Sequence, residues 1–187
     1  MSIPETVAVI LALAYVILAI VESRFCWLAG GVSALLYIVI FTDARLYMEA
    51  GLQGVYIAMA VYGWFTWGAH PAADSLPIRR WSIRRHALLA IAVMALSLAL
   101  GEILSRLTDA AWPAVDSFTT LAALVATYMV TQKILENWLW WIIIDAISIG
   151  LYLSRDLHLT ALLFCGYVVL ATAGWIAWHK KYSAIES

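Results

Sequence analysis

The sequence predicts an all-α integral membrane protein with seven transmembrane helices. Of its 187 residues, 65% are hydrophobic and only 12% are charged, and the mean hydropathy is +0.90. A soluble domain of this size could not hide so much apolar surface from water, so we expect a lipid bilayer to cover it. The net charge of −1 gives no basic field, and no nucleic-acid partner is expected.

Seven apolar runs account for the predicted helices, because a helix that crosses a bilayer needs roughly 20 mostly apolar residues. In chain order the runs are 4–22, 25–41, 47–69, 86–105, 117–132, 138–154 and 158–179. The polar stretch 70–85 separates the first three runs from the rest. All four prolines lie at a terminus or in a predicted loop, as helix interiors require: Pro4, Pro71, Pro77 and Pro113.

The basic residues predict the orientation in the membrane. If the seven spans alternate, one side receives Arg24, Arg79, Arg80, Arg84, Arg85, Lys133, Lys180 and Lys181, and the other receives Arg45, Arg106 and Arg155. Cytoplasmic loops are rich in lysine and arginine, so the first side is predicted to be cytoplasmic. The N-terminus is then outside and the C-terminus inside. Four tryptophans near the cytoplasmic helix ends favour interfacial anchoring: Trp64, Trp67, Trp175 and Trp178. The alternative is that one tryptophan of each pair lines an inner gate.

An internal repeat predicts how the helices are grouped. Glu22-Ser23 with Trp27 recurs as Glu136-Asn137 with Trp141, at an offset of 136 − 22 = 114. Gly63-Trp64-x-x-Trp67 recurs as Gly174-Trp175-x-x-Trp178, at an offset of 174 − 63 = 111. The difference of three residues predicts a slip between these two anchors.

The repeat divides the chain into a 3+1+3 arrangement. Residues 1–69 form the first three-helix repeat, 70–116 form a basic cytoplasmic loop with linker helix 4, and 117–187 form the second repeat and a cytoplasmic tail. Three crossings reverse the chain, and the linker helix restores its direction, so the repeats are parallel. Transporters built this way hold their substrate between the copies, near the bilayer midplane.

A stripe on the sixth predicted helix is the strongest candidate for a binding site. At about 100° per residue, Trp138, Trp141 and Asp145 fall on one helical face, which Ser148 and Tyr152 extend. An acid at membrane depth faces a partner, a cavity or a substrate. Two indole faces and a negative charge suit a small cationic aromatic molecule.

Other residues extend or limit this interpretation. Gln53 and Tyr56 share a face of the third predicted helix, where an amide is expected to contact substrate. No Gly-x-Ser-x-Gly or His-x-x-Glu-His motif occurs, so an enzyme is not expected. The four histidines lack metal-ligand spacing, and neither a metal nor a cofactor is predicted.

Three motifs resemble the PnuC family of bacterial vitamin transporters: Glu-Asn-Trp-x-x-Trp at 136–141, Gly-Trp-x-x-Trp at 63–67 and 174–178, and Leu46-Tyr47 followed by Leu52-Gln53. The resemblance implies a doubled version of the sugar-transporting SWEET fold, assembled as a homotrimer in the inner membrane. It also implies vitamin uptake by facilitated diffusion, with a cytoplasmic kinase that traps the cargo.

The resemblance also implies a pocket. The family's pocket pattern is Trp-x-x-Trp-x-x-x-Asn, which Trp138 and Trp141 match directly after Asn137. Asp145 stands at the asparagine of this pattern, and Ser33 stands at a second asparagine of the family. A carboxylate in place of an amide suits a cationic ring or an aminopyrimidine donor. Thiamine offers both, and the PnuT branch of the family is associated with thiamine, so thiamine is the expected substrate. Nicotinamide riboside, which is also cationic, is the alternative.

An alternative from a different class of transport protein is the substrate-binding subunit of an ATP-driven vitamin importer. Such subunits are similar in size, and Ala8-x-x-x-Ala12 resembles their small-residue contact with partner subunits. The internal repeat fits this interpretation poorly.

Overall fold

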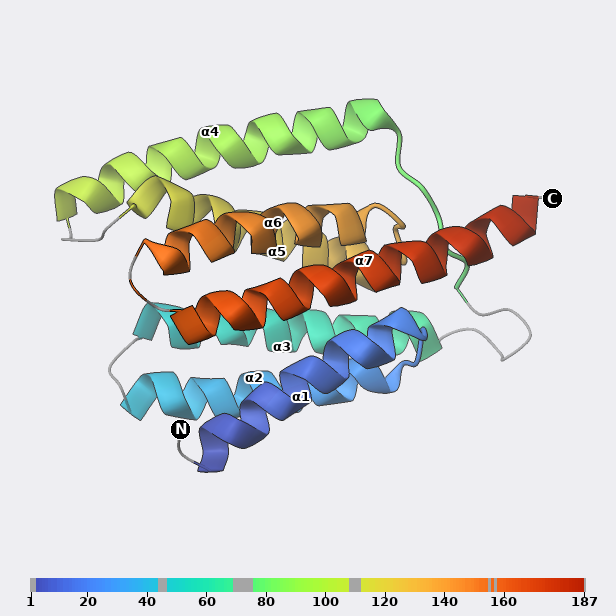
Figure 1. The fold of residues 1–187 in the computed structure, drawn as a ribbon, viewed down its shortest axis with the longest axis horizontal. Coiled ribbons are helices and arrows are strands. Elements are labelled where there is room, and N and C mark those ends of the chain that lie inside the picture. The colour runs from blue at the N-terminus through green and yellow to red at the C-terminus, as the bar shows by residue number, and fades with distance from the viewer. Residues whose placement is uncertain are drawn as a thin grey trace. The chain divides into compact units, whose positions relative to one another are not determined.

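The computed structural model describes residues 3–43, 47–68, 76–107, 112–154, 156 and 158–186. Across these ranges the chain forms seven α-helices: α1 (Ile3–Ile20), α2 (Phe25–Asp43), α3 (Tyr47–Gly68), α4 (Ile83–Leu107), α5 (Pro113–Thr131), α6 (Asn137–Leu153) and α7 (His158–Glu186) (Figure 1). The predicted all-α fold with seven helices is confirmed. The main differences lie at the ends. Pro113 opens α5 four residues early, where a missing N–H is tolerated, and α7 runs past 179.

The helices have the composition of membrane spans. Within the described ranges, five are long and apolar enough to cross a bilayer: α1, α2, α4, α5 and Thr160–Ala184 of α7. α6 is an apolar helix of 17 residues, and α3 carries Gln53 among several tyrosines and tryptophans. Large apolar side chains such as Ile91 and Val169 are exposed, as lipid-facing residues must be. The chain is a multi-pass membrane protein.

By its internal contacts the chain divides into two compact units. Unit 1 comprises Met1–Arg79, Thr127–Leu135 and Ile176–Ser187, and unit 2 comprises Arg80–Ala126 and Glu136–Trp175. These units differ from the predicted repeats because the last turns of α5 and α7 pack with α1–α3. The repeat boundaries at 69 and 117 stay a prediction.

In unit 1, α2 packs against both α1 and α3 (Figure 1). The hydroxyl of Ser33 on α2 donates a buried hydrogen bond to the carbonyl of Ala8 on α1, at 2.8 Å. Gly31 of α2 faces Ala60 of α3, and a Cβ there would lie 3.5 Å from that of Ala60, an ordinary van der Waals contact. Small residues and one hydroxyl therefore join the first three helices.

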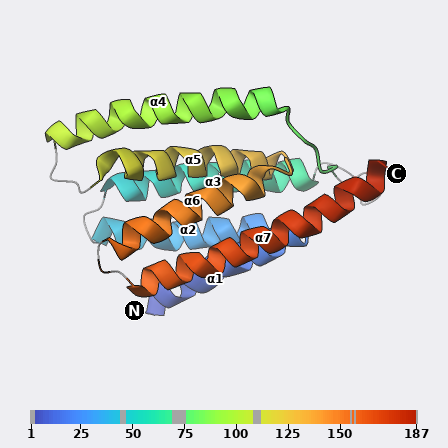
Figure 2. The ribbon, with the colours of Figure 1, turned by 45° about the horizontal axis from the view of Figure 1, so that its top comes forward.

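In unit 2, α4 lies on the outside of the group, with α5 and α6 beneath it (Figure 2). Gly101 brings α4 against the first turn of α5, because a Cβ at Gly101 would lie 2.5 Å from the Cα of Ala114. α6 and α7 meet through Tyr152 and Phe164, whose ring centroids are 5.0 Å apart.

Matching contacts in the two units reveal the register of the repeat. A Cβ on Gly63 would lie 2.3 Å from the indole of Trp27, and one on Gly174 would lie 2.6 Å from that of Trp138. The differences 138 − 27 and 174 − 63 are both 111. The counterpart of Trp27 is therefore Trp138. The predicted pairing with Trp141, and the slip it required, are wrong.

The ends of α1 and α5 repeat the same geometry at the same offset. The amide of Glu22 donates to the carbonyl of Ala19, and that of Lys133 donates to the carbonyl of Val130, each at 3.0 Å. Glu22 has a φ of 57° and Lys133 a φ of 49°, the left-handed conformation that ends many helices. Glu22 thus corresponds to Lys133, a residue of opposite charge, and its predicted counterpart Glu136 lies elsewhere.

Candidate functional site

The predicted stripe on α6 is largely buried. Trp138, Asp145 and Ser148 are buried, and Trp141 and Tyr152 are half-buried. Trp140 points away from this stripe, because its indole N–H donates to Nδ1 of His86 on α4 at 3.2 Å. The helical spacing in the sequence therefore identified the inward face of α6 correctly.

Asp145 is the most unusual member of the stripe. Its side chain belongs to a residue that is only 4% exposed, and among the described residues it takes part in no ion pair or hydrogen bond. A buried polar group without a partner is costly, and an acid inside a membrane helix more so. A ligand that supplies positive charge or hydrogen-bond donors would relieve that cost.

Trp138 and Tyr152 both have structural contacts. One face of the Trp138 indole packs directly against the backbone of Gly174 on α7. The ring of Tyr152 packs on Phe164, which in turn meets Tyr167 edge-on at 5.6 Å. These aromatic contacts hold α6 against α7. Trp138 and Tyr152 therefore have a structural role, and Trp141 and Asp145 are the better candidates for substrate contact.

The other predicted site residues lie on three helices. Gln53 and Tyr56 are half-buried on α3, Ser33 is buried on α2, and Asn137 is fully buried at the start of α6. The hydroxyl of Ser33 donates its proton to the carbonyl of Ala8, so only its oxygen lone pairs could accept a hydrogen bond from a substrate. The assembly of these residues and the α6 stripe into one pocket stays a prediction.

Glu136, which directly precedes α6, holds the segment before α4. Its carboxylate accepts a 2.7 Å hydrogen bond from Nε of Arg80 and a 3.2 Å bond from the amide of Trp81. Nε2 of His86 lies 3.5 Å from the same carboxylate, and Arg85 lies over the ring of Trp81 at 3.7 Å. Two arginines of the basic stretch therefore have specific contacts in addition to any role in topology.

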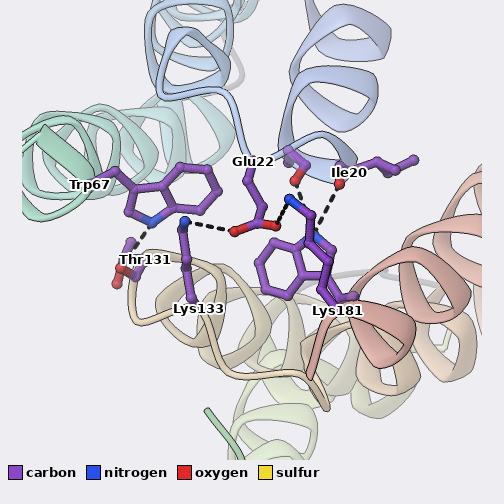
Figure 3. A network of polar contacts seen from close by, with 8 residues as sticks. Ile20, Glu22, Trp67, Thr131, Lys133 and Lys181 are labelled. Carbon is purple, nitrogen blue, oxygen red and sulfur yellow. Dashed lines mark hydrogen bonds and ion pairs between the residues drawn. The ribbon is translucent and has the colours of Figure 1, made fainter. Parts of the chain in front are cut away.

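A second polar cluster of the described residues lies in unit 1, and sequence reasoning missed it. The half-buried carboxylate of Glu22 accepts hydrogen bonds from Nζ of Lys133 at 2.8 Å and from Nζ of Lys181 at 2.6 Å (Figure 3). The side chain of Lys133 is only 4% exposed, whereas that of Lys181 is 63% exposed. Burial raises the pKa of Glu22, but the hydrogen bonds and charges of the two lysines outweigh it and lower the pKa below its ordinary value.

Two tryptophans complete this cluster. The indole N–H of Trp67 donates to the carbonyl of Thr131 at 3.1 Å, and that of Trp178 donates to the carbonyl of Ile20 at 3.1 Å (Figure 3). Nζ of Lys133 also lies over the ring of Trp67, 4.8 Å from its centroid. Both tryptophans are buried, so the prediction that they anchor the protein in the membrane interface is wrong. We call Glu22, Lys133, Lys181, Trp67 and Trp178 the bridging network.

One signal in the sequence could have revealed the network. With a single offset of 111, Glu22 aligns with Lys133, and Trp67 aligns with Trp178. Opposite charges at equivalent positions of a repeat can pair across its symmetry axis. No metal site accompanies the network, because no group of three or more histidine, cysteine, aspartate or glutamate ligands occurs among the described residues.

Comparison with known proteins agrees with this architecture. The nicotinamide riboside transporter PnuC of Escherichia coli (strain K12) is 26% identical over 200 residues, covering 93% of this chain and 84% of that protein, and the Shigella flexneri PnuC gives the same values. The riboflavin/roseoflavin transporter RibM of Streptomyces davaonensis is 27% identical over 139 residues, covering 71% of this chain and 64% of RibM. These relatives are named as transporters, not as enzymes.

A solved structure supports the fold. The crystal structure of the vitamin B3 transporter PnuC matches with a TM-score of 0.76 at 22% identity, covering 97% of this chain and 82% of that one. The sequence profile of the family described as nicotinamide mononucleotide transporters matches residues 2–180. The seven helices and the profile, which spans nearly the whole chain, place this protein in the nicotinamide mononucleotide transporter family, to which PnuC gives its other name.

Proposed function

We propose that this protein carries nicotinamide riboside across a bacterial inner membrane by facilitated diffusion. The observation that carries the proposal is Asp145, a buried acid on a membrane helix that has no charged partner among the described residues. The pyridinium ring of nicotinamide riboside is flat and positively charged. It would stack against Trp141 and place its charge near Asp145, an arrangement worth roughly 1–2 kcal/mol from the cation–π contact alone.

Thiamine is the second candidate, and one observation favours it. The resemblance to PnuC implies an asparagine at the position of Asp145, and a carboxylate can also accept hydrogen bonds from an aminopyrimidine. The names of the relatives favour nicotinamide riboside, so we rank thiamine below it. Riboflavin, which RibM carries by name, is uncharged and would gain less from Asp145.

The remaining features of the proposal concern transport itself. The sequence has no nucleotide-binding motif and no chain of intramembrane acids, so transport is driven by the substrate gradient alone. Net uptake then needs a cytoplasmic kinase that phosphorylates the vitamin. We also propose a periplasmic N-terminus, a cytoplasmic C-terminus and a homotrimer.

Binding and transport by one variant pair test the role of Asp145. Asp145→Asn is compared with Asp43→Asn, which removes an exposed acid from the end of α2. We expect wild-type protein and Asp43→Asn to bind nicotinamide riboside in calorimetry and to exchange it in proteoliposomes. Asp145→Asn should weaken binding about tenfold or more, because a buried charge–charge contact is lost.

The same measurements rank the substrates. Thiamine and riboflavin are titrated into each protein beside nicotinamide riboside. Tighter binding of thiamine than of the riboside would reverse our ranking. Equal affinity of wild type and Asp145→Asn for every vitamin would remove Asp145 from the pocket. Uptake that requires an added ATPase subunit would favour the ATP-driven importer instead.

A further inference from the structure

Every hydrogen bond of the bridging network joins one predicted repeat to the other. Trp67 on α3 donates to Thr131 on α5, and Trp178 on α7 donates to Ile20 on α1. Glu22, in the loop between α1 and α2, pairs with Lys133, in the loop between α5 and α6. The network therefore ties the first copy to the second at the end where α1, α3 and α5 terminate (Figure 3).

The bonds are also reciprocal. Trp67 and Trp178 differ by 111 residues, and so do their acceptors Ile20 and Thr131, each bonded to the tryptophan of the opposite copy. Glu22 and Lys133 differ by the same 111 and bond to each other. A pair of symmetry-equivalent positions can meet only at the symmetry axis, so the ion pair marks the axis between the copies.

The charged residues of the network lie close in sequence to the tryptophans that pack each copy. Glu22 lies five residues before Trp27, and Lys133 lies five residues before Trp138, so each charge sits in the short loop that leads into the helix whose tryptophan packs its own copy. The network also includes the ring pair Trp67–Trp178, with centroids 6.3 Å apart. The two rings and the ion pair of the nearly buried Lys133 with Glu22 therefore lie together at this end.

We infer that the bridging network is the gate at this end of the transporter. The inference rests on the proposed function, because a carrier built from two copies exposes its site by rocking one copy against the other. Contacts that join the copies at one end must break each time that end opens. Glu22 and Lys133 then separate, and the two indoles leave the opposite helix ends.

Cross-linking tests whether the end must open. In a Cys165→Ala background, which removes the exposed cysteine and leaves only the buried Cys26, the double variant Glu22→Cys/Lys133→Cys is joined by a short reducible bis-thiosulfonate. We expect exchange of nicotinamide riboside in proteoliposomes to fall about tenfold or more on cross-linking and to recover on reduction. Full exchange by the cross-linked protein would overturn the gate.

Lysine labelling tests the gate without relying on transport. The chain has three lysines, of which Lys133 is buried and Lys180 is exposed, so an amine-reactive ester should label Lys180 quickly and Lys133 only when the gate opens. Glu22→Gln should raise the labelling rate of Lys133 about tenfold, because its buried cation loses its partner, and leave Lys180 unchanged. Lys180→Met is the matched control and should leave Lys133 as slow as in wild type.

The two measurements separate the two proposals. If wild-type protein binds neither nicotinamide riboside nor thiamine, and the double-cysteine protein exchanges neither of them before cross-linking, the proposed function fails. The labelling result still decides whether the network is a gate. If Lys133 labels as fast as Lys180 in wild-type protein, or is unaffected by Glu22→Gln, the network is not a closed gate, whatever the substrate.

Discussion

At residue 22 the backbone adopts a φ of 57°, and at residue 133 a φ of 49°, although neither residue is glycine. The left-handed conformation costs a residue with a side chain about 1–2 kcal/mol relative to the right-handed one. Both residues use their side chains in the ion pair between Glu22 and Lys133. The charges therefore explain why glycine, the usual residue at such helix ends, is absent from both.

Substitution at residue 22 separates the backbone cost from the side-chain benefit. Glu22→Ala and Glu22→Gly both lose the ion pair, but only glycine adopts the left-handed conformation without strain. We expect both variants to be less stable than wild type and Glu22→Gly to be more stable than Glu22→Ala by about 1 kcal/mol. Denaturant unfolding in detergent measures the difference. Equal stabilities would mean that the helix end relaxes when the charge is removed.

At this scale the sequence singled out the buried acid of α6 but not the network. Asp145 stood out because an acid within an apolar run is unusual wherever its helix packs. From the sequence alone Lys133 indicates membrane topology, because a lysine after an apolar run is typical of a cytoplasmic loop. Only the three-dimensional position of Glu22 shows that the same lysine is buried and paired.

At the scale of elements, one contact occurs twice, a tryptophan at the start of a helix packed against a glycine. Trp27 of α2 packs on Gly63 of α3, and Trp138 of α6 packs on Gly174 of α7. The glycines allow the indole to approach the helix backbone, which brings the two helices close together. In the second copy this contact holds α6, and with it Asp145, close against α7.

Alanine substitutions test the two contacts. A methyl group at Gly63 or Gly174 would overlap the indole, and overpacking of this kind costs about 1–3 kcal/mol. Gly166 is the control, because a Cβ there meets nothing within 4 Å. We expect Gly63→Ala and Gly174→Ala to lower the melting temperature and Gly166→Ala to leave it unchanged or raise it slightly. A melting temperature that is unchanged in all three would show that the tryptophans move aside at no cost.

At the scale of the whole molecule, the chain divides into two compact units. The C-terminal ends of α5 and α7 belong to the same unit as α1–α3. Unit 1 owes this composition to the bridging network, since Lys133, Trp178 and Lys181 come from the second predicted repeat. The stability of this part of the protein therefore depends on a small number of charged and indole contacts as well as on apolar packing.

Acid should weaken these contacts in a defined direction. The pKa of Glu22 is lower in the folded protein than in the unfolded chain, because the pull of Lys133 and Lys181 outweighs burial. Its contribution to stability is therefore fully present above the ordinary carboxyl pKa and is lost as the pH falls through the lower, folded value. We expect the melting temperature of wild type to fall over this range by more than that of Glu22→Gln. Parallel pH profiles of the two proteins would contradict the assignment.

The sequence by itself determined the number, order and approximate limits of the helices, and the face of α6 that carries Trp138, Asp145 and Ser148. The helix limits follow from the lengths of the apolar runs, and the face of α6 follows from the helical period of 3.6 residues. These properties do not depend on how the helices meet.

Only the tertiary structure decided the register of the repeat and the pairs that it brings together. Matching by residue identity paired Glu22 with Glu136, whereas the packing of Trp27 and Trp138 aligns Glu22 with Lys133. The physical reason is that equivalent positions on a symmetry axis face one another, so opposite charges are favoured there and identical ones are not. Which helix ends meet at that axis is a property of the folded chain.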